Sequence, residues 1–444
     1  MLWRRVGPVG REGQRLHAVA PRPLTEVLGL PVTHDLRGRF HDSLEAYDWA
    51  LSNLMPRVDR GYAHTVGGVV DGRAIGSGPW KSMDFVVMHR GFVFNLNFNA
   101  HDTSAFGTSF VGDPQQAAMY RRILSALQQP AFITGYGDSE NDWFPLMNEY
   151  GHAYLVPQYR NCSFHAAVPP LRTPVRAPVH APYRPKPGDV DKTYVCFLSS
   201  DGDTMKGPIS MQYRAWTDDP QRGKVPFTYC LPVCMGRYFP AMLEYYYDTA
   251  TPADDFAACA VWRFNGQPEQ QRRLWGRVAE DLRLSDMRNL VPVTMEPAAP
   301  AALADLAQIA KPVGLAEIIW GGMFLGRQEM LPDGTPLVTN ADWFGYTHRV
   351  LDEGKWEAIP LDRAFADKQQ WPQAVAKIVA HCEKVAAAHP RPFVILIYSS
   401  LHQAGVQYSM HADIAKALDP KRFVVVRLSD AFEALRAGQG GAGK

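Results

Sequence analysis

The sequence as given lacks the segments that are typical of secreted and membrane-spanning proteins. The first residues, "MLWRRVGPVGREGQRLHAVAPRP", contain arginines but no apolar run of about 7 to 15 residues, so the chain as given carries no signal peptide. It also has no uninterrupted apolar window of about 18 residues, which argues against a membrane span. The localisation is therefore left open by these residues.

Neither charge nor cysteine is present in a pattern that specifies a partner. The 46 basic and 45 acidic residues leave a net charge of +1, which gives no electrostatic case for binding nucleic acid. The cysteines form no CxxC pair and are expected to be buried thiols rather than zinc ligands. They are Cys162, Cys196, Cys230, Cys234, Cys259 and Cys382.

What is present is a long globular chain in which helical and strand patterns alternate. The 444 residues, of which 46% are hydrophobic, exceed one ordinary domain. In "HDSLEAYDWALSNLMP" the pair Asp42 and Glu45 predicts a capping box at the start of a helix. "GFVFNLNF" and "AFITGYG" predict strands, and "DPQQAAMYRRILSALQQP" predicts a helix between them. This part is expected to be a small α/β domain.

Seven prolines between Pro169 and Pro187 predict a linker or a loop that follows the surface, because such a run cannot form an internal helix or strand. We therefore expect an N-terminal arm (1–27), an α/β domain (28–168), a proline-rich segment (169–192), a larger domain (193–436) and a disordered tail (437–444).

Strand-like runs alternate with helical segments in the larger domain. The runs are "TYVCFLSS", "VPFTYCL", "DFAACAVW", "NLVPVTM", "GLAEIIW", "PLVTNADW", "PFVILIYSS" and "RFVVVRLS". Their number and spacing predict an α/β fold with a (β/α) barrel-like domain. An open doubly wound sheet is the alternative, but no GxGxxG follows the first strand to support a nucleotide site.

Acids and aromatic residues follow the predicted strands, at the ends where barrel enzymes place their chemistry. The candidate catalytic residues are Asp201, Asp203, Glu296 and Asp342. The candidate substrate-binding residues are Glu140, Tyr229, Trp262, Arg263, Trp320, Trp343, Tyr398 and His402. Carboxyl groups can protonate a leaving oxygen and attack or stabilise an anomeric carbon, and indole rings stack on sugars. The alternative is that these acids only form turns or cap helices.

The pair Asp201 and Asp203, separated by Gly202, is also compatible with a divalent metal ion. His402 or His411 could add a nitrogen ligand, as in barrel deacetylases. The histidines have no HxxxH or HExxH spacing, however, so no cofactor is expected and the metal remains an alternative.

Five segments in a fixed order are informative together: "LGLPVTHDLRGRFHDSLEAYDWAL", "GFVFNLNF", "ITGYGDSENDWFPLMNEYGHAYLVPQYRNCS", "YVCFLSSDGDTMKG" and "RGKVPFTYCLPVCMGRYFPAMLEYYYDTATPADDF". In these segments the chain resembles the GxGYxYP glycoside hydrolase family. It implies an α/β part followed by a barrel-like domain, a carbohydrate substrate, and export if the N-terminus is truncated. Asp201 to Asp203 match the family's SDGDN-like block with Thr204 in place of Asn, and Glu140 matches an acid of the N-terminal part.

The motif that gives the family its name is not retained: "AACAVWRFNGQP" follows "TATPADDF" at that place.

From the acids and aromatic residues at the strand ends and from the resemblance, we expect a carbohydrate-active hydrolase. Asp203 and Glu296 are its expected acid pair, and Asp201 is an orienting residue. A metal-dependent sugar deacetylase and a non-catalytic glycan-binding protein remain alternatives.

Overall fold

A computed structural model describes the chain over most of the predicted elements. It covers residues 31, 34–66, 69–70, 73–74, 82–96, 114–135, 140–155, 161–181, 183–199, 205, 207–211, 216–261, 268–294, 317–322, 327–330, 336–339, 343–344, 348–352, 355–359, 371–399 and 407–440. The chain divides into two compact units, Met1–Asp48 and Trp49–Lys444. The predicted domain limits within the second unit stay predictions.

The first predicted helix forms with the cap that its sequence specifies. Helix α2 (Ser43–Asn53) is preceded by Asp42, whose carboxylate accepts the backbone N–H of Glu45 at 2.9 Å. The Glu45 carboxylate accepts the N–H of His41 at 2.9 Å. The first bond is the N-cap predicted for Asp42, which is confirmed, whereas Glu45 reaches the N–H of the residue before the N-cap and not that of Asp42 itself.

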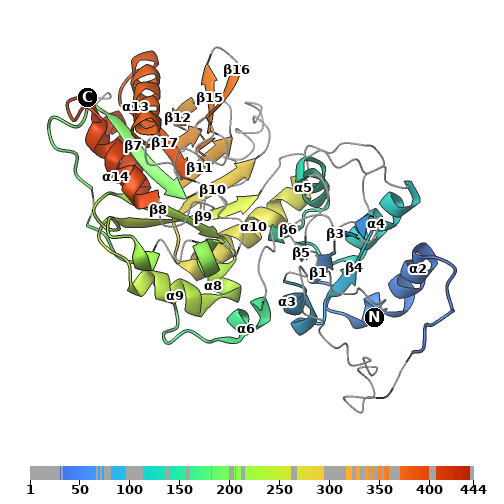
Figure 1. Cartoon of the computed structure of the whole chain (residues 1–444). Coiled ribbons are helices and arrows are strands. Elements are labelled where there is room, and N and C mark those ends of the chain that lie inside the picture. Colours follow the sequence, from blue (N-terminus) through green and yellow to red (C-terminus); the bar gives the residue numbers. More distant parts are fainter. Residues whose placement is uncertain are drawn as a thin grey trace, which may run out of the picture. The chain divides into compact units, whose positions relative to one another are not determined.

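A small parallel sheet with the order β4-β1-β5-β6 forms the earlier α/β layer. Its strands are β1 (Tyr62–Thr65), β4 (Phe92–Phe94), β5 (Phe132–Gly135) and β6 (Ala153–Leu155). The connecting elements are η1 (Met55–Arg57), a hairpin of β2 (Val69–Val70) and β3 (Arg73–Ala74), α3 (Met83–Met88), α4 (Pro114–Ala126), α5 (Glu140–Glu149) and α6 (Cys162–Ala167). Figure 1 shows α3, α4 and α5 around this sheet.

One glycine of this sheet is required by the close approach of two strands. Gly135 ends β5 with φ of 116°, and a Cβ built there would lie 2.0 Å from the carbonyl oxygen of Thr65 on β1. No other residue type fits this position without moving a strand.

The proline-rich segment contains no helix or strand in its described residues and follows the surface. Three carboxylates accept its backbone N–H groups. Glu244 accepts from Leu171 at 2.6 Å, Asp286 from Ala177 at 3.0 Å, and Glu433 from Tyr183 at 2.6 Å. Side chains of the larger domain thus replace the backbone partners that prolines prevent.

The second sheet is large and mostly parallel, with the order β12-β13-β11-β10-β9-β8-β7-β17-β14-β15-β16 and β18 paired to β7. The parallel strands are β7 (Thr193–Ser199), β8 (Phe227–Pro232), β9 (Asp254–Val261), β10 (Asn289–Thr294), β11 (Glu317–Gly322), β13 (Pro336–Thr339), β14 (Trp343–Phe344), β17 (Phe393–Ser399) and β18 (Phe423–Val425). Three antiparallel strands were not predicted: β12 (Arg327–Met330), β15 (His348–Asp352) and β16 (Lys355–Ile359).

The sixth predicted strand splits in two, and this split requires the sheet to curl. Its first part, β13, pairs with β11 on one side of the sheet, and its second part, β14, pairs with β17 on the other. Thr339 and Trp343 are four residues apart, so they are separated by at most about 14 Å. The two sides of the parallel series must therefore approach each other, which gives the predicted barrel-like fold.

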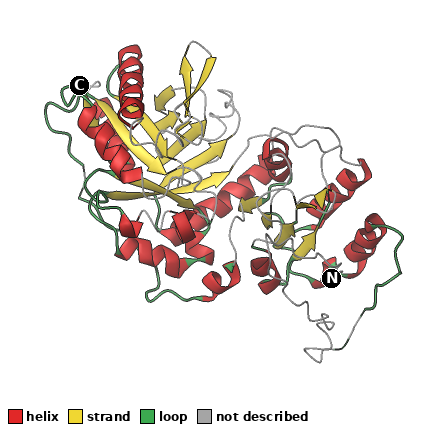
Figure 2. Ribbon diagram, viewed as in Figure 1, coloured by secondary structure: helices red, strands yellow, loops and turns green. Residues whose placement is uncertain are grey.

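Helices cover both faces of this curled sheet (Figure 2). Alternate residues of β7, such as Val195 and Phe197, pack in one cluster with side chains of the outer helices. These helices are α8 (Met235–Tyr238), α9 (Pro240–Asp248), α10 (Pro268–Ser285), α13 (Trp371–Ala388) and α14 (Gln407–Ala417). Among the described helices, none is both long and apolar enough to cross a membrane.

The other face of the sheet packs against α15 (Leu428–Gly440). This helix contacts both β7 and β13, so it lies on the concave side of the curl. Small residues of the sheet, including Cys230, Ala257 and Cys259, make room for it. The eighth predicted strand is consequently short: β18 pairs only with the first half of β7, and the chain then enters α15.

Candidate functional site at the C-terminal edge of the curled sheet

The ends of three neighbouring strands lie side by side at one edge of the sheet. Ser199, the last residue of β7, is the register partner of Ser399, the last residue of β17. Phe344 of β14 is in turn the partner of Ser399. Because these strands are parallel, the segments that follow them leave the sheet at the same edge.

The other half of the sheet ends at the same edge. Val261 of β9 is the partner of Val293 of β10, and Thr294 of β10 is the partner of Gly322 of β11. The strand ends that precede most of the predicted residues therefore lie along one edge of the sheet.

Most predicted site residues lie outside the described residues, so their roles stay predictions. These are Asp201, Asp203, Trp262, Arg263, Glu296, Asp342 and His402. For Trp320, Trp343 and Tyr398 the structure describes the strand but not the side chain. Trp343 and Tyr398 are register partners on β14 and β17, so their backbones are adjacent. Glu140 is the first residue of α5, beside the small sheet.

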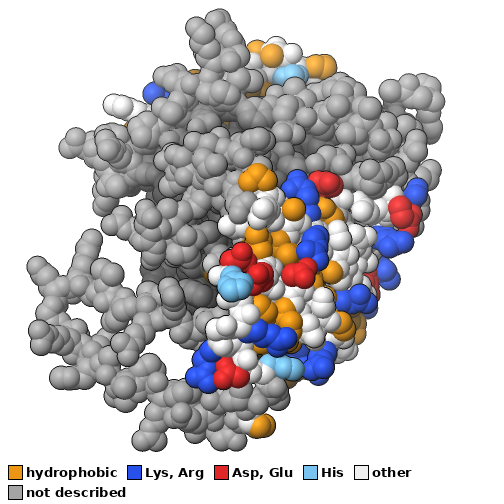
Figure 3. All heavy atoms as spheres, turned by 90° about the vertical axis from the view of Figure 1, so that its right-hand side faces the viewer, with side chains coloured by type: hydrophobic (Ala, Val, Ile, Leu, Met, Phe, Trp, Pro, Cys, Tyr) orange, Lys and Arg blue, Asp and Glu red, His pale blue; other side chains and the backbone are white. Residues whose placement is uncertain are grey.

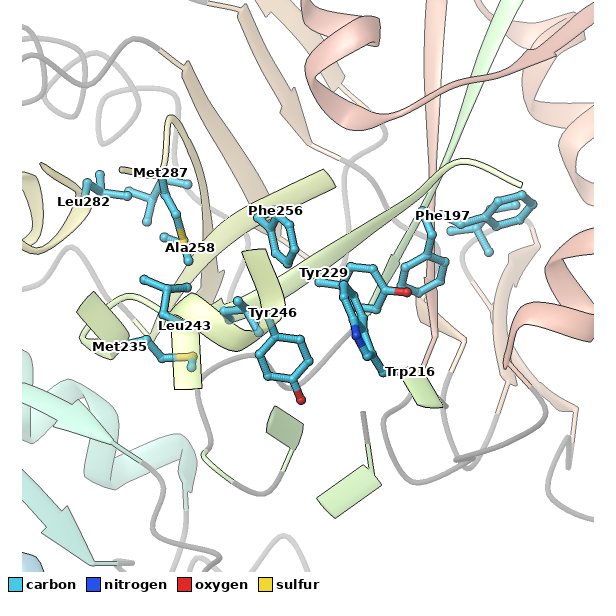
Figure 4. Close-up of a cluster of buried hydrophobic side chains, with 14 of the residues drawn as sticks. Phe197, Trp216, Tyr229, Met235, Leu243, Tyr246, Phe256, Ala258, Leu282 and Met287 are labelled. Carbon is cyan, nitrogen blue, oxygen red and sulfur yellow. The ribbon is translucent and has the colours of Figure 1, made fainter. Parts of the chain in front are cut away.

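Tyr229 is the one predicted substrate-binding residue whose side chain is described. Its ring is 1% exposed and lies 4.8 Å from Trp216 and 4.9 Å from Phe227, centroid to centroid. Figure 4 shows it in a cluster of buried side chains with Trp216 and Phe256. The ring therefore lies on the face of the sheet that packs against α8, α9, α10, α13 and α14.

His411, which was considered as a metal ligand, lies in the core. It is fully buried in α14, with its ring 4.5 Å from Phe197 and 4.9 Å from Phe227. Burial lowers the pKa of its imidazole to about 3, so the ring is neutral at pH 7. Within the described ranges, no three His, Cys, Asp or Glu side chains are grouped to hold a metal ion.

The six cysteines are buried free thiols, as predicted. Burial raises the pKa of Cys162 to about 11, while the hydroxyl of Ser82 lies 3.3 Å from its sulfur. Burial also raises the pKa of Cys230 and Cys234. Such thiols are protonated at pH 7 and are poor nucleophiles.

A polar cluster that the sequence did not reveal lies at the opposite ends of the strands. Thr228, Asp255 and Asn289 stand at the N-terminal ends of β8, β9 and β10, and they surround the start of α15. The Asp255 carboxylate accepts the backbone N–H of Ser429 at 3.0 Å, and Asn289 donates to the Ser429 hydroxyl at 2.7 Å. Because this cluster is internally bonded and lies at the N-terminal edge, its role is structural.

Charge is mixed among the described side chains of one face of the molecule. On the face shown in Figure 3, basic side chains lie among acidic and apolar ones. A nucleic-acid-binding face would instead present a continuous basic patch.

Two family models match the chain. The model described as "GxGYxYP putative glycoside hydrolase C-terminal domain" matches residues 191–260, and the "GxGYxYP third domain" matches residues 73–167. The first match contains β7, β8 and most of β9, and the second contains most of the small sheet. No curated protein matches the chain.

Two solved structures match the chain. One, described as a putative hydrolase from Bacteroides thetaiotaomicron VPI-5482, has a TM-score of 0.65 and 14% identity, with 94% of this chain and 73% of that chain covered. The other, described as a putative polysaccharide deacetylase from Mycobacterium smegmatis, has a TM-score of 0.39 and 14% identity, with 59% and 96% covered. The first similarity supports the mixed α/β fold with a curled parallel sheet.

Proposed function

Since the chain belongs to the GxGYxYP family through its two matched domains, we propose that it is a carbohydrate-active hydrolase that cleaves glycosidic bonds at the C-terminal edge of its curled sheet. The observation that supports this most is the common edge reached by β7, β17, β14, β9, β10 and β11. Acid-bearing segments follow several of these strands. Barrel enzymes assemble their active sites from such segments.

The acid pair in this proposal is Asp203 and Glu296. One carboxyl group protonates the departing oxygen, and the other attacks the anomeric carbon or activates a water molecule. Asp201 orients the substrate or Asp203, and Asp342 is a further acid of the same edge. We assign ring stacking to Trp262, Trp320 and Trp343, and polar contacts with the sugar to Arg263, Tyr398 and His402.

The N-terminal edge is a poor alternative site because its carboxylates are already engaged. Asp255 is bound by Ser429, and Asp430 is paired with Arg427 at 2.6 Å. Asp254 accepts from Arg222 at 2.9 Å. Catalysis needs a carboxyl group that can exchange a proton with substrate, which these pairs oppose.

The test is hydrolysis of a panel of neutral and acidic oligosaccharides by the wild-type chain and by Asp203→Asn. We expect Asp203→Asn to lower turnover by about 100-fold or more, the range of general acid–base catalysis, while binding survives. Asp413→Asn serves as the control, because this half-exposed residue pairs with Lys416 on α14. Equal turnover by Asp203→Asn and the wild type would sink the assignment.

Metal removal separates this proposal from a sugar deacetylase that uses Asp201, Asp203 and His402. We expect glycoside cleavage to be unchanged after treatment with a chelator. Loss of an acetyl-releasing activity, restored by one divalent ion, would favour the deacetylase instead. Saturable sugar binding with no product in either assay would identify a non-catalytic binding protein.

A further inference from the structure

A pocket with a volume of about 330 Å³ lies outside the sheet, between α6, η2 (Gly207–Met211) and α9. Its described lining consists of side chains from these three elements and the residue that follows α6. The lining residues used below are His165, Val168, Ile209, Ala241, Met242 and Tyr245.

The walls of this pocket begin at the predicted catalytic edge. η2 starts at Gly207, a few residues after β7 ends and after Asp203, and Met205 between them is fully buried. α9 starts at Pro240, after β8 and the short helix α8, and Ala241 and Met242 lie in its first turn. Along the chain, η2 thus follows the segment that carries Asp201 and Asp203.

The described lining offers no partner to a charged ligand. No described lining residue is a lysine, arginine, aspartate or glutamate. Burial lowers the pKa of His165, which the charge of Asp84 raises to a smaller extent, so its imidazole is neutral at pH 7. An ionised group placed here would lose hydration without gaining an opposite charge.

Two adjacent tyrosines give the pocket one fixed and one exposed aromatic wall. Tyr246 is buried, donates its hydroxyl to the carbonyl of Pro208, and lies 5.0 Å from Trp216, ring to ring. Tyr245 is 38% exposed and meets the Tyr246 ring edge-on, at 5.7 Å and 72°. The anchored ring of Tyr246 thus supports the solvent-facing ring of Tyr245.

We infer that this pocket binds one uncharged pyranose ring of a carbohydrate ligand, with its apolar face against Tyr245. A pyranose has an apolar C–H face and a polar edge, which suits a pocket that is apolar inside and open to water on one side. The carbohydrate class rests on the proposed function, whereas the location and the preference for an uncharged ring rest on the lining.

The test measures binding of neutral and uronic-acid oligosaccharides by calorimetry and by ligand-detected NMR. Tyr245→Ala removes the exposed ring, and Ala241→Phe fills the pocket. We expect each to weaken binding of neutral sugars by about tenfold or more, which corresponds to about 1.4 kcal/mol. Val179→Ala is the matched control, because Val179 is 98% exposed on the proline-rich segment and does not line the pocket.

The outcomes distinguish this inference from the proposed function. Unchanged binding in both pocket variants, with circular dichroism and Tm like the wild type, overturns the inference. Binding of an apolar dye but of no sugar also overturns it and indicates an apolar partner. Loss of neutral-sugar binding in both variants supports it, even if Asp203→Asn shows that the hydrolytic proposal is wrong.

Discussion

Ser429 binds Asp255 with two different donors. Its backbone N–H lies 3.0 Å from one carboxylate oxygen, and its hydroxyl lies 2.9 Å from the same oxygen. Ser429 is in the first turn of α15, where backbone N–H groups have no partner within the helix. A carboxylate from β9 therefore completes the start of a helix that is packed inside the curled sheet.

Removing this carboxylate should destabilise the protein. We expect Asp255→Ala to lower the free energy of unfolding by about 1–3 kcal/mol, because it leaves buried donors of Ser429 without an acceptor. Asp255→Asn should cost less, since its amide oxygen still accepts the backbone N–H. Urea unfolding at pH 7 measures both, with Asp413→Ala at the half-exposed Asp413 as the control. An Asp255→Ala loss no larger than that of the control would contradict this role.

The stability difference between the wild type and Asp255→Asn should change with pH in one direction. Burial raises the pKa of Asp255 above its ordinary value of 3.8, although the bonds from Ser429 lower it in part. A raised pKa means that the folded state holds the proton more tightly, so wild-type stability falls as pH rises from about 4 toward the folded pKa. The stability difference between the wild type and Asp255→Asn should therefore shrink over that interval.

The sequence predicts those strands that are buried on both faces. β7, β8 and β17 are continuous apolar runs, as expected for parallel strands covered by helices on both sides. β12, β15 and β16 contain charged residues and no regular alternation, so no pattern distinguished them from loops. The split of the sixth run depends on pairing with β11 and β17, which are distant in sequence.

The sequence predicts which strand ends precede the candidate residues, and the structure shows that these strands end at one edge of the sheet. The sequence shows which residues follow each strand. Because the strands are parallel, their C-terminal ends share one edge of the sheet. The separation of Asp203 from Glu296 does not follow, since it depends on how the loops after β7 and β10 fold. The Asp255–Ser429 contact joins residues 174 positions apart, and the sequence around Asp255 suggests only a turn.

The hydrogen bonds between Glu244 and the proline-rich segment should weaken in acid. Burial raises the pKa of Glu244. The hydrogen bonds from Leu171 and Arg172, together with the charge of Arg172, lower this pKa by more than burial raises it, so the net pKa is below the ordinary value of 4.5. The contact therefore stabilises the fold above about pH 4.5, and this stabilisation is lost as pH falls through the lowered pKa. The protection factors of the Leu171 and Arg172 amides, which correct for the slower intrinsic exchange at lower pH, should therefore fall there in the wild type, relative to the same protein at pH 6.

Glu244→Gln supplies the matched control for that measurement. It keeps an acceptor oxygen but cannot be protonated in this range, so its exchange at Leu171 should depend on pH only through the intrinsic rate. Equal pH dependence in the wild type and in Glu244→Gln would show that another group governs the segment.

His411 should make the fold sensitive to mild acid. Burial lowers its pKa to about 3, whereas the unfolded chain has the ordinary value of 6.5. The neutral ring stabilises the folded state above about pH 6.5, and stability falls below it by about 1.4 kcal/mol per pH unit until the folded pKa is reached. Urea midpoints between pH 7 and pH 4.5 should fall less in His411→Leu than in the wild type. His41→Leu, at an exposed position, should keep the wild-type slope, and a parallel slope in His411→Leu would refute the assignment.

Asp286 combines a backbone constraint with a contact to the proline-rich segment, and three substitutions separate the two. It directly follows α10 with φ of 52°, and its carboxylate accepts the N–H of Ala177 at 3.0 Å. The guanidinium of Arg176 lies 3.5 Å from the same carboxylate. Asp286→Gly accepts the left-handed conformation but loses the contact, and Asp286→Ala loses both, so Ala should be less stable than Gly by about 1 kcal/mol. Asp286→Asn keeps an acceptor and tolerates this conformation. Trypsin should therefore cleave after Arg176 faster in the Gly and Ala variants than in Asn, and equal rates in all three would show that Asp286 does not hold the segment.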